Sequence, residues 1–277
     1  MVTAREVSVN QVKAITRKIE EQNIRGPKGE LIRIEVFCHG ALCMAVSGKC
    51  YLSLDNFNTS ANRGACVQPC RRGYTVQDRD KEITLNIDNE YIMSPKDLCT
   101  LPFLDKVLDA GVKILKIEGR GRSPEYTKVT VGVYSEAVKA IQNGEFTEEK
   151  VAAWTERLRS VYNRDFWDGY YLGRKTGEWT QRYGSQATKT KIFVGTVTNF
   201  FGKINVAEIR METQDLKVGD DIMIIGPTTG VYEDTVSEIR VDLKAVESTE
   251  KGELCSIPAK DVVRRGDKVY KVIDAVL

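Results

Sequence analysis

The sequence predicts an α/β region followed by a small antiparallel β-barrel, and three observations carry this prediction. Between residues 31 and 144, patterns of strand, helix, strand and helix alternate, which is typical of α/β architecture. From residue 192 onward, short apolar runs are separated by turns of the Gly-Asp kind, as in small β-barrels. A chain of 277 residues is also long enough for two domains. We therefore expect an α/β region at 1–170, a linker at 171–190 and a β-barrel at 191–277.

The first elements follow from the spacing of apolar residues. A helix is expected from Ser8, because apolar residues recur at i, i+3 and i+7 over 12–19, and it should end before the turn-rich RGPKGE. The run LIRIEVFCH at 31–39 alternates in polarity and predicts a strand with Ile32, Ile34 and Val36 on one face.

The middle of the chain predicts an irregular segment and then a return to α/β order. Residues 51–74 are rich in Asn, Ser, Gly and Arg, which predicts a long irregular loop, and loops of that length are usually functional. We expect a hairpin over 82–93, and a helix followed by Gly111 and a strand within 101–120.

Two further helices close the α/β region. One is expected to begin at Ser123 and Pro124, with Ser as N-cap and Pro at the first helical position, and to run towards Gly144. The next should run from Glu148 to about Tyr162. The recognisable βα units number too few for a closed (β/α)8 barrel of roughly 200–250 residues. Either the chain is a fragment, or a protein partner covers its open sheet edge.

Six of the seven cysteines lie between residues 38 and 99. The N-terminus lacks the pattern of a secretory signal and the apolar runs are too short to span a membrane, so we expect a cytoplasmic protein. Clustered thiols in that compartment favour metal binding over disulfides.

The cysteine spacing leaves three interpretations open. Cys43 and Cys50 bracket six residues, Cys66 and Cys70 bracket three, and Cys99 follows later. Four thiolates from separate loops are the usual ligands of a [4Fe-4S] cluster. Structural zinc is the nearest alternative, although only one pair has the close spacing that zinc prefers. Buried inert thiols are the third interpretation.

Polar residues near the cysteines are candidates for a site. The candidate anion-binding residues, for phosphate or carboxylate groups, are Arg63, Arg71, Arg72, Arg120 and Arg122, with solvated surface charge as the alternative.

His39 is the one histidine of the chain, and it is either a structural residue at a strand end or a proton donor beside a metal. Glu118 and Arg120 follow a predicted strand, at the edge where α/β barrels place their sites, and a salt bridge of Glu118 with Lys116 or Arg120 is the alternative.

Hydrolytic motifs are missing from the sequence. It contains no G-x-S-x-G elbow and no H-E-x-x-H zinc motif. A pair of His39 with a nearby thiol would be needed for cysteine protease chemistry, yet adjacent residues of a strand point to opposite faces. The residues therefore argue against direct proteolysis.

The segments EVFCHGALCMAVSGKC, NRGACVQPCRRGY, SPKDLC and LKIEGRGRSPEY resemble the signature of the peptidase U32 family over residues 1 to about 170. The strands that follow resemble the family's C-terminal barrel, itself similar to barrels of translation factors. The resemblance implies a (β/α)-barrel-type catalytic region at 1–170, of which the N-terminal half is absent from this chain.

The resemblance implies two competing activities. The family is named for peptidase or collagenase activity, while other members carry out oxygen-independent hydroxylation of a tRNA wobble uridine, a ribosomal RNA base or a quinone precursor. The hydroxylating members hold a [4Fe-4S] cluster, and the matching positions here are Cys43, Cys50, Cys66 and Cys99. The tRNA-acting subgroup, which uses prephenate, shares the C-terminal barrel and is the closest match.

The hypothesis from the sequence is thus a tRNA wobble-uridine hydroxylase. It assigns catalytic roles to His39, Glu118 and Arg120, and substrate binding to Arg63, Arg71, Arg72 and Arg122, with tRNA as partner and prephenate as co-substrate. A U32 peptidase and a truncated, non-catalytic binding module are the alternatives. The roles of Cys38, Cys70 and Cys255 stay open.

Overall fold

A computed structural model describes residues 1–43, 45–46, 49–72, 74–78, 80, 83–86, 94–174, 178, 180 and 184–275. Contacts divide the chain into two units, residues 1–122 with 129–186, and residues 123–128 with 187–277. Each unit has its own apolar core. Among the described residues, no helix combines the length and the apolar character needed to cross a membrane.

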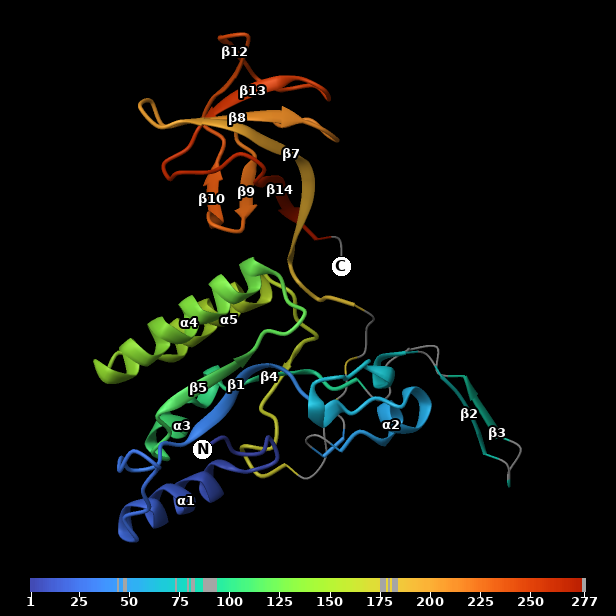
Figure 1. The fold of residues 1–277 in the computed structure, drawn as a ribbon, viewed down its shortest axis with the longest axis vertical. Helices are drawn as coiled ribbons and strands as arrows, with labels where there is room; N and C mark the ends of the chain where they lie inside the picture. Colours follow the sequence, from blue (N-terminus) through green and yellow to red (C-terminus); the bar gives the residue numbers. More distant parts are fainter. Residues whose placement is uncertain are drawn as a thin grey trace. The chain divides into compact units, whose positions relative to one another are not determined.

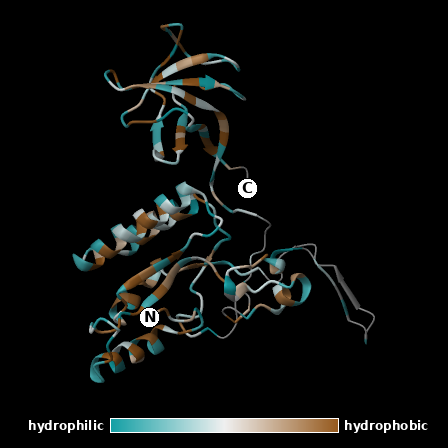
Figure 2. Cartoon of the chain, viewed as in Figure 1, coloured by the Kyte–Doolittle hydropathy of each residue, from teal (hydrophilic) through white to brown (hydrophobic). Residues whose placement is uncertain are grey.

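The first unit is built on a four-stranded sheet in the order β5-β1-β4-β6. Its strands are β1 (Glu35–Ala41), β4 (Asp97–Cys99), β5 (Ile114–Glu118) and β6 (Phe166–Trp167). Strand β1 is parallel to β5 and antiparallel to β4, while β4 is parallel to β6. Apolar residues dominate β1 and β5 (Figure 2), and Val36 is fully buried. The α/β character is confirmed, whereas a barrel-like arrangement of this region stays a prediction.

Helices α1 (Val9–Glu21), α3 (Leu104–Asp109), α4 (Pro124–Gln142) and α5 (Glu148–Arg159) match the expected helices. A capping box starts α1, because Ser8 Oγ accepts from the Gln11 amide while the Gln11 side chain accepts from the Ser8 amide. Helices α4 and α5 lie side by side (Figure 1), joined where Trp154 Nε1 donates to Glu136 at 2.9 Å.

The segment after β1 is more regular than its composition predicts. The expected irregular loop at 51–74 contains α2 (Tyr51–Phe57) and the 3₁₀ turns η1 (Ala61–Arg63) and η2 (Pro69–Arg71), and η3 (Leu101–Phe103) precedes α3. Asn58 ends α2 in the left-handed conformation that Asn tolerates. The polar composition of this segment correctly indicates frequent turns, but it does not exclude short helices between them.

The hairpin expected over 82–93 lies largely outside the described residues. Its described part, β3 (Ile83–Asn86), pairs in antiparallel fashion with β2 (Thr75–Asp78). The strand therefore finds its partner earlier in the chain than the sequence suggests.

The second unit is an eight-stranded antiparallel sheet in the order β10-β9-β14-β7-β8-β13-β11-β12. Its strands are β7 (Lys189–Phe201), β8 (Val206–Met211), β9 (Asp221–Gly226), β10 (Gly230–Thr235), β11 (Ile239–Val241), β12 (Lys244–Val246), β13 (Leu254–Pro258) and β14 (Lys268–Asp274). The edge strands β10 and β12 are not paired with each other in this sheet, so a closed barrel stays a prediction. One face carries the core, which includes Val194, Ile209, Ile224 and Val269.

We expect Gly195→Ala to destabilise the second unit by about 1–3 kcal/mol, the usual cost of overpacking. A methyl group at Gly195 would lie 2.2 Å from the carbonyl oxygen of Arg210 on the neighbouring strand. Thermal unfolding measures the change. Gly202→Ala is the matched control, because its methyl group would meet nothing closer than Phe200 at 3.8 Å. Equal unfolding temperatures for the two variants would contradict the packing of β7 on β8.

Candidate functional site

His39 lies at the centre of the first unit's sheet. Its register partners are Cys99 on β4 and Ile117 on β5, and only 1% of the residue is exposed. The imidazole Nδ1 lies 3.4 Å from the Tyr134 hydroxyl, and the ring packs against Phe166. Burial, and then the positive charge of Arg122, lowers the pKa of His39 to about 3. The imidazole is therefore neutral near pH 7 and holds a single N–H proton.

Four thiols of the segment after β1, here called the loop thiols, are Cys43, Cys50, Cys66 and Cys70. Burial raises the pKa of Cys43, and the neighbouring Cys50 and Cys66 add to this. Burial also raises the pKa of Cys70, where Arg71 opposes the shift and the other three loop thiols add to it. Cys50 Sγ lies 3.4 Å from Ser53 Oγ. The loop thiols therefore lie within electrostatic reach of one another.

The chemistry of the loop thiols fits a sulfur-liganded iron or zinc centre, since thiolates are the ligands that both prefer. As placed, however, no group of three or more His, Cys, Asp or Glu side chains in the described part of the chain is gathered around a single metal position. Binding a metal would require these thiols to lose their protons and to draw together.

Cys99, the fourth ligand that the family resemblance implies, has a different environment. It is 4% exposed, and its Sγ lies 3.9 Å from the Tyr134 hydroxyl. Burial raises its pKa to about 11. Cys99 in turn adds to the raised pKa of Cys38, which is fully buried. Because β4 pairs Cys99 with His39, the sheet holds the Cys99 thiol in the interior. Cys70, by contrast, interacts electrostatically with the other three loop thiols, as expected of a fourth ligand.

Arg120 contacts the segment that carries the loop thiols, and Glu118 binds the backbone of Arg120. Glu118 pairs with Arg5 at 2.9 Å rather than with Lys116, and it accepts the Arg120 backbone amide at 3.1 Å. Arg120 Nη1 donates to the carbonyl oxygen of Gly64 at 3.1 Å. The Arg120 side chain thus ties the end of β5 to the loop that carries Cys66.

The remaining predicted arginines divide by environment. Arg63 is exposed on η1, and the Arg72 guanidinium lies 4.7 Å from the centre of the Phe57 ring. The Arg122 side chain, a candidate for phosphate or carboxylate contacts, is 6% exposed and binds Asp97, which is 1% exposed, at 3.0 Å. Arg71 donates to Gln68 at 2.9 Å.

The residues that sequence reasoning missed are Arg5, Asp97, Tyr134 and Arg164. Tyr134 Oη donates to the Cys38 carbonyl at 2.8 Å and accepts the Thr100 amide at 3.2 Å, so it links α4 to β1 and β4. Asp97, a charged residue at the start of the short buried strand β4, was the one local signal of a buried ion pair. The others come from distant elements and leave no trace in spacing.

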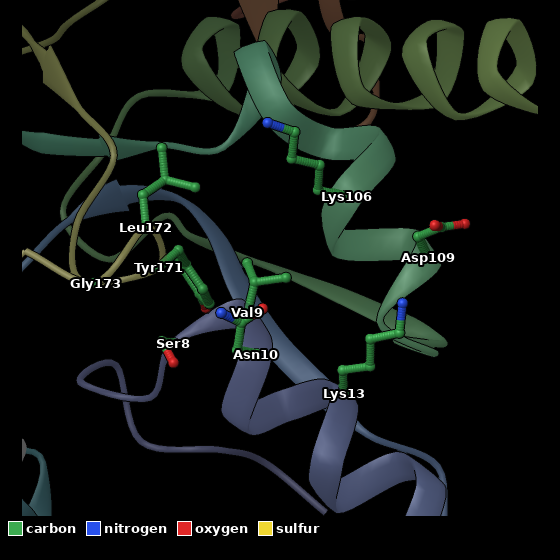
Figure 3. A pocket seen from close by; sticks show the side chains of 9 residues that line it. All are labelled: Ser8, Val9, Asn10, Lys13, Lys106, Asp109, Tyr171, Leu172 and Gly173. Atoms are coloured by element: carbon green, nitrogen blue, oxygen red, sulfur yellow. The ribbon is translucent and has the colours of Figure 1, made fainter.

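A pocket of about 340 Å³ lies apart from these residues, between the start of α1, α3 and residues 171–173 (Figure 3). Lys13 and Lys106 line it, and both are exposed. None of the predicted site residues lines this pocket.

Comparison with known proteins gives a family and several relatives. The family model described as peptidase family U32 matches residues 1–181. A protein of Porphyromonas gingivalis named collagenase is 55% identical over 98% of this chain and 66% of its own length. An uncharacterized protease of Methanocaldococcus jannaschii is 36% identical over 100% of this chain and 67% of its own. A Bacillus subtilis protein named tRNA hydroxylation protein P1 is 31% identical over 86% of this chain and 55% of its own length. The chain thus spans about two thirds of the length of the first two relatives.

We expect the free energy of unfolding of His39→Asn to decrease less steeply with falling pH than that of the wild-type protein. The folded-state pKa of His39 lies below its ordinary value, so the unfolded state binds the proton first as the pH falls. Stability from this group is therefore complete above about pH 6.5 and decreases by about 1.4 kcal/mol per pH unit down towards the folded-state pKa. Urea unfolding of both proteins at about pH 7 and about pH 5 isolates the difference. Equal slopes for the two proteins would show that His39 is solvated.

Proposed function

The chain belongs to peptidase family U32, and on that premise we propose that it is an iron–sulfur-dependent enzyme that hydroxylates a wobble uridine of tRNA. The observation that carries the proposal is the set of four loop thiols within electrostatic reach of one another. A wobble base lies in a single-stranded loop, so it can enter a protein site without melting a duplex. The relative named tRNA hydroxylation protein P1 supports the choice of substrate.

The proposed cluster ligands are Cys43, Cys50, Cys66 and Cys70. Cys70 takes the place that the resemblance gives to Cys99, because Cys70 interacts with all three other loop thiols whereas Cys99 is buried beside Tyr134. A bound [4Fe-4S] cluster would supply one-electron redox chemistry at this end of the sheet. Zinc is the alternative occupant.

The surrounding residues have positioning roles in this proposal. Neutral His39 donates or accepts one hydrogen bond without adding charge beside the cluster. Glu118 and Arg120 hold the loop that carries Cys66. Exposed Arg63 and Arg72 are suited to tRNA phosphates, which are bound through charge and without sequence preference. Prephenate, a dicarboxylate, is the proposed co-substrate.

Peptide cleavage is the second candidate, favoured by the 55% identity to a protein named collagenase. A cysteine protease needs a thiolate beside a base. Cys38, next to His39, is fully buried with a raised pKa, and burial also raises the pKa of Cys43 and of Cys70. None of these three thiols has the lowered pKa of an activated nucleophile, so we propose hydroxylation ahead of peptide cleavage.

We expect the protein purified without oxygen to contain about four iron and four sulfide atoms per chain with visible charge-transfer absorption. Cys43→Ala, Cys66→Ala and Cys70→Ala should each lower the iron content, because each removes a thiolate ligand. Cys255→Ala, in the second unit, is the control and should keep its iron. Retention of iron by Cys70→Ala together with its loss in Cys99→Ala would instead support the ligand set that the family resemblance implies. Wild-type protein that stays iron-free after reconstitution would end the cluster proposal.

We expect the gene to restore 5-hydroxyuridine in tRNA when expressed in a bacterial strain that lacks its own wobble-hydroxylation genes. Mass spectrometry of tRNA nucleosides measures the product. Cys43→Ala should abolish the rescue and Cys255→Ala should preserve it. Unchanged tRNA, combined with cleavage of denatured collagen by the purified protein, would favour the peptidase instead.

A further inference from the structure

The pocket beside the start of α1 has walls that hydrogen bonds hold in place (Figure 3). The Val9 amide donates to the Tyr171 carbonyl at 3.0 Å, which fixes the start of α1 against that part of the chain. Thr16 Oγ1 donates to the Ala110 carbonyl at 2.6 Å and so joins α1 to the end of α3. Tyr171 is anchored in turn, because its hydroxyl donates to the Phe37 carbonyl on β1 at 2.7 Å. The pocket is therefore already formed in the folded unit.

Two lysines and one aspartate give the pocket its charge. Lys106 extends from α3 towards Leu172, and Lys13 extends from α1 towards α3 (Figure 3). The carboxylate of Asp109 points away from the side chains of Tyr171 and Leu172. Neither ammonium group has an ion pair or a hydrogen bond to another of the described residues. Two ammonium groups against one carboxylate leave the pocket with a formal charge of +1.

The pocket also presents apolar surface to a ligand. The side chain of Val9 is half-buried, and Leu172 is 51% exposed although it is a large apolar residue. Tyr171 contributes its ring, because its hydroxyl is already bonded to the Phe37 carbonyl. The volume of about 340 Å³ lies at the low end of the range for small-molecule sites. A ligand that fits here is therefore small, with one charged end and one apolar end.

We propose that this pocket binds a small monocarboxylate with an aliphatic body, of the size of hexanoate. The single excess positive charge matches a monoanion, and the ammonium groups of Lys13 and Lys106 act as point charges for its carboxylate. The aliphatic body lies against Val9 and Leu172, where removing apolar surface from water stabilises the complex. Both lysines are exposed, so water and salt screen their charge and the apolar contact supplies much of the affinity.

This inference goes beyond the proposed function and does not rest on it. No residue that lines the pocket is a proposed cluster ligand or a proposed contact for tRNA. Iron content, tRNA hydroxylation and carboxylate binding can therefore be measured on the same protein, and each can fail independently.

Isothermal titration of the full chain with hexanoate, acetate and 1-hexanol, at constant ionic strength, tests the proposal. We expect hexanoate to bind about tenfold or more tightly than acetate or 1-hexanol, a difference of about 1.4 kcal/mol. Lys13→Gln and Lys106→Gln should each weaken hexanoate by about threefold, as for an exposed ion pair, and leave 1-hexanol unchanged. Leu172→Ser should reduce the preference for hexanoate over acetate by about fivefold, because it removes apolar contact.

Lys18→Gln is the matched control, because Lys18 is exposed on the same helix but does not line the pocket. It should leave hexanoate binding unchanged. All the substituted side chains are exposed, so each variant is expected to fold, and thermal unfolding checks this. Equal affinities for hexanoate and acetate, or for hexanoate and 1-hexanol, would overturn the proposal. So would hexanoate binding that Lys13→Gln and Lys106→Gln leave unchanged, or that Lys18→Gln weakens as much as they do.

Discussion

Strand β1 is the constraint on which the rest of the first unit depends, because it pairs on both edges with distant parts of the chain. Its parallel neighbour β5 leads to Arg120, whose side chain donates to the Gly64 carbonyl in the segment that carries the loop thiols. Its antiparallel neighbour β4 fixes Asp97 and Cys99 in the interior. The Tyr134 hydroxyl joins the Cys38 carbonyl, the Thr100 amide and His39, and so ties α4 to both strands.

Burial controls the chemistry of these groups more than their mutual contacts do. It is the largest cause of the lowered pKa of His39 and of the raised pKa of Cys43, Cys70 and Cys99. All four groups are thereby held in their neutral forms near pH 7. A site of neutral thiols and a neutral imidazole is a poor one for nucleophilic attack on a peptide. It is compatible with thiols that deprotonate on binding a metal.

A positively charged side chain, Arg71, acts on one of the loop thiols in this unit. The positive charge of Arg71 opposes the raised pKa of Cys70 and also acts on Asp97. The collagenase name of a relative and the hydroxylation name of another apply to proteins longer than this chain.

The sequence by itself determined the features that depend on local order. Helical periodicity and capping residues predicted α1, α4 and α5, and the alternation of apolar and polar residues predicted β1. The positions of the loop thiols in the sequence already place them in one segment. The ion pairs between distant residues could be identified only from the tertiary structure. Arg5 meets Glu118 across 113 residues, and Arg164 meets Asp97 across 67. The burial of Arg122 and of Cys99 likewise follows from which strand pairs with β1. Strand pairing is a long-range choice made by the whole core, and no spacing within the sequence records it.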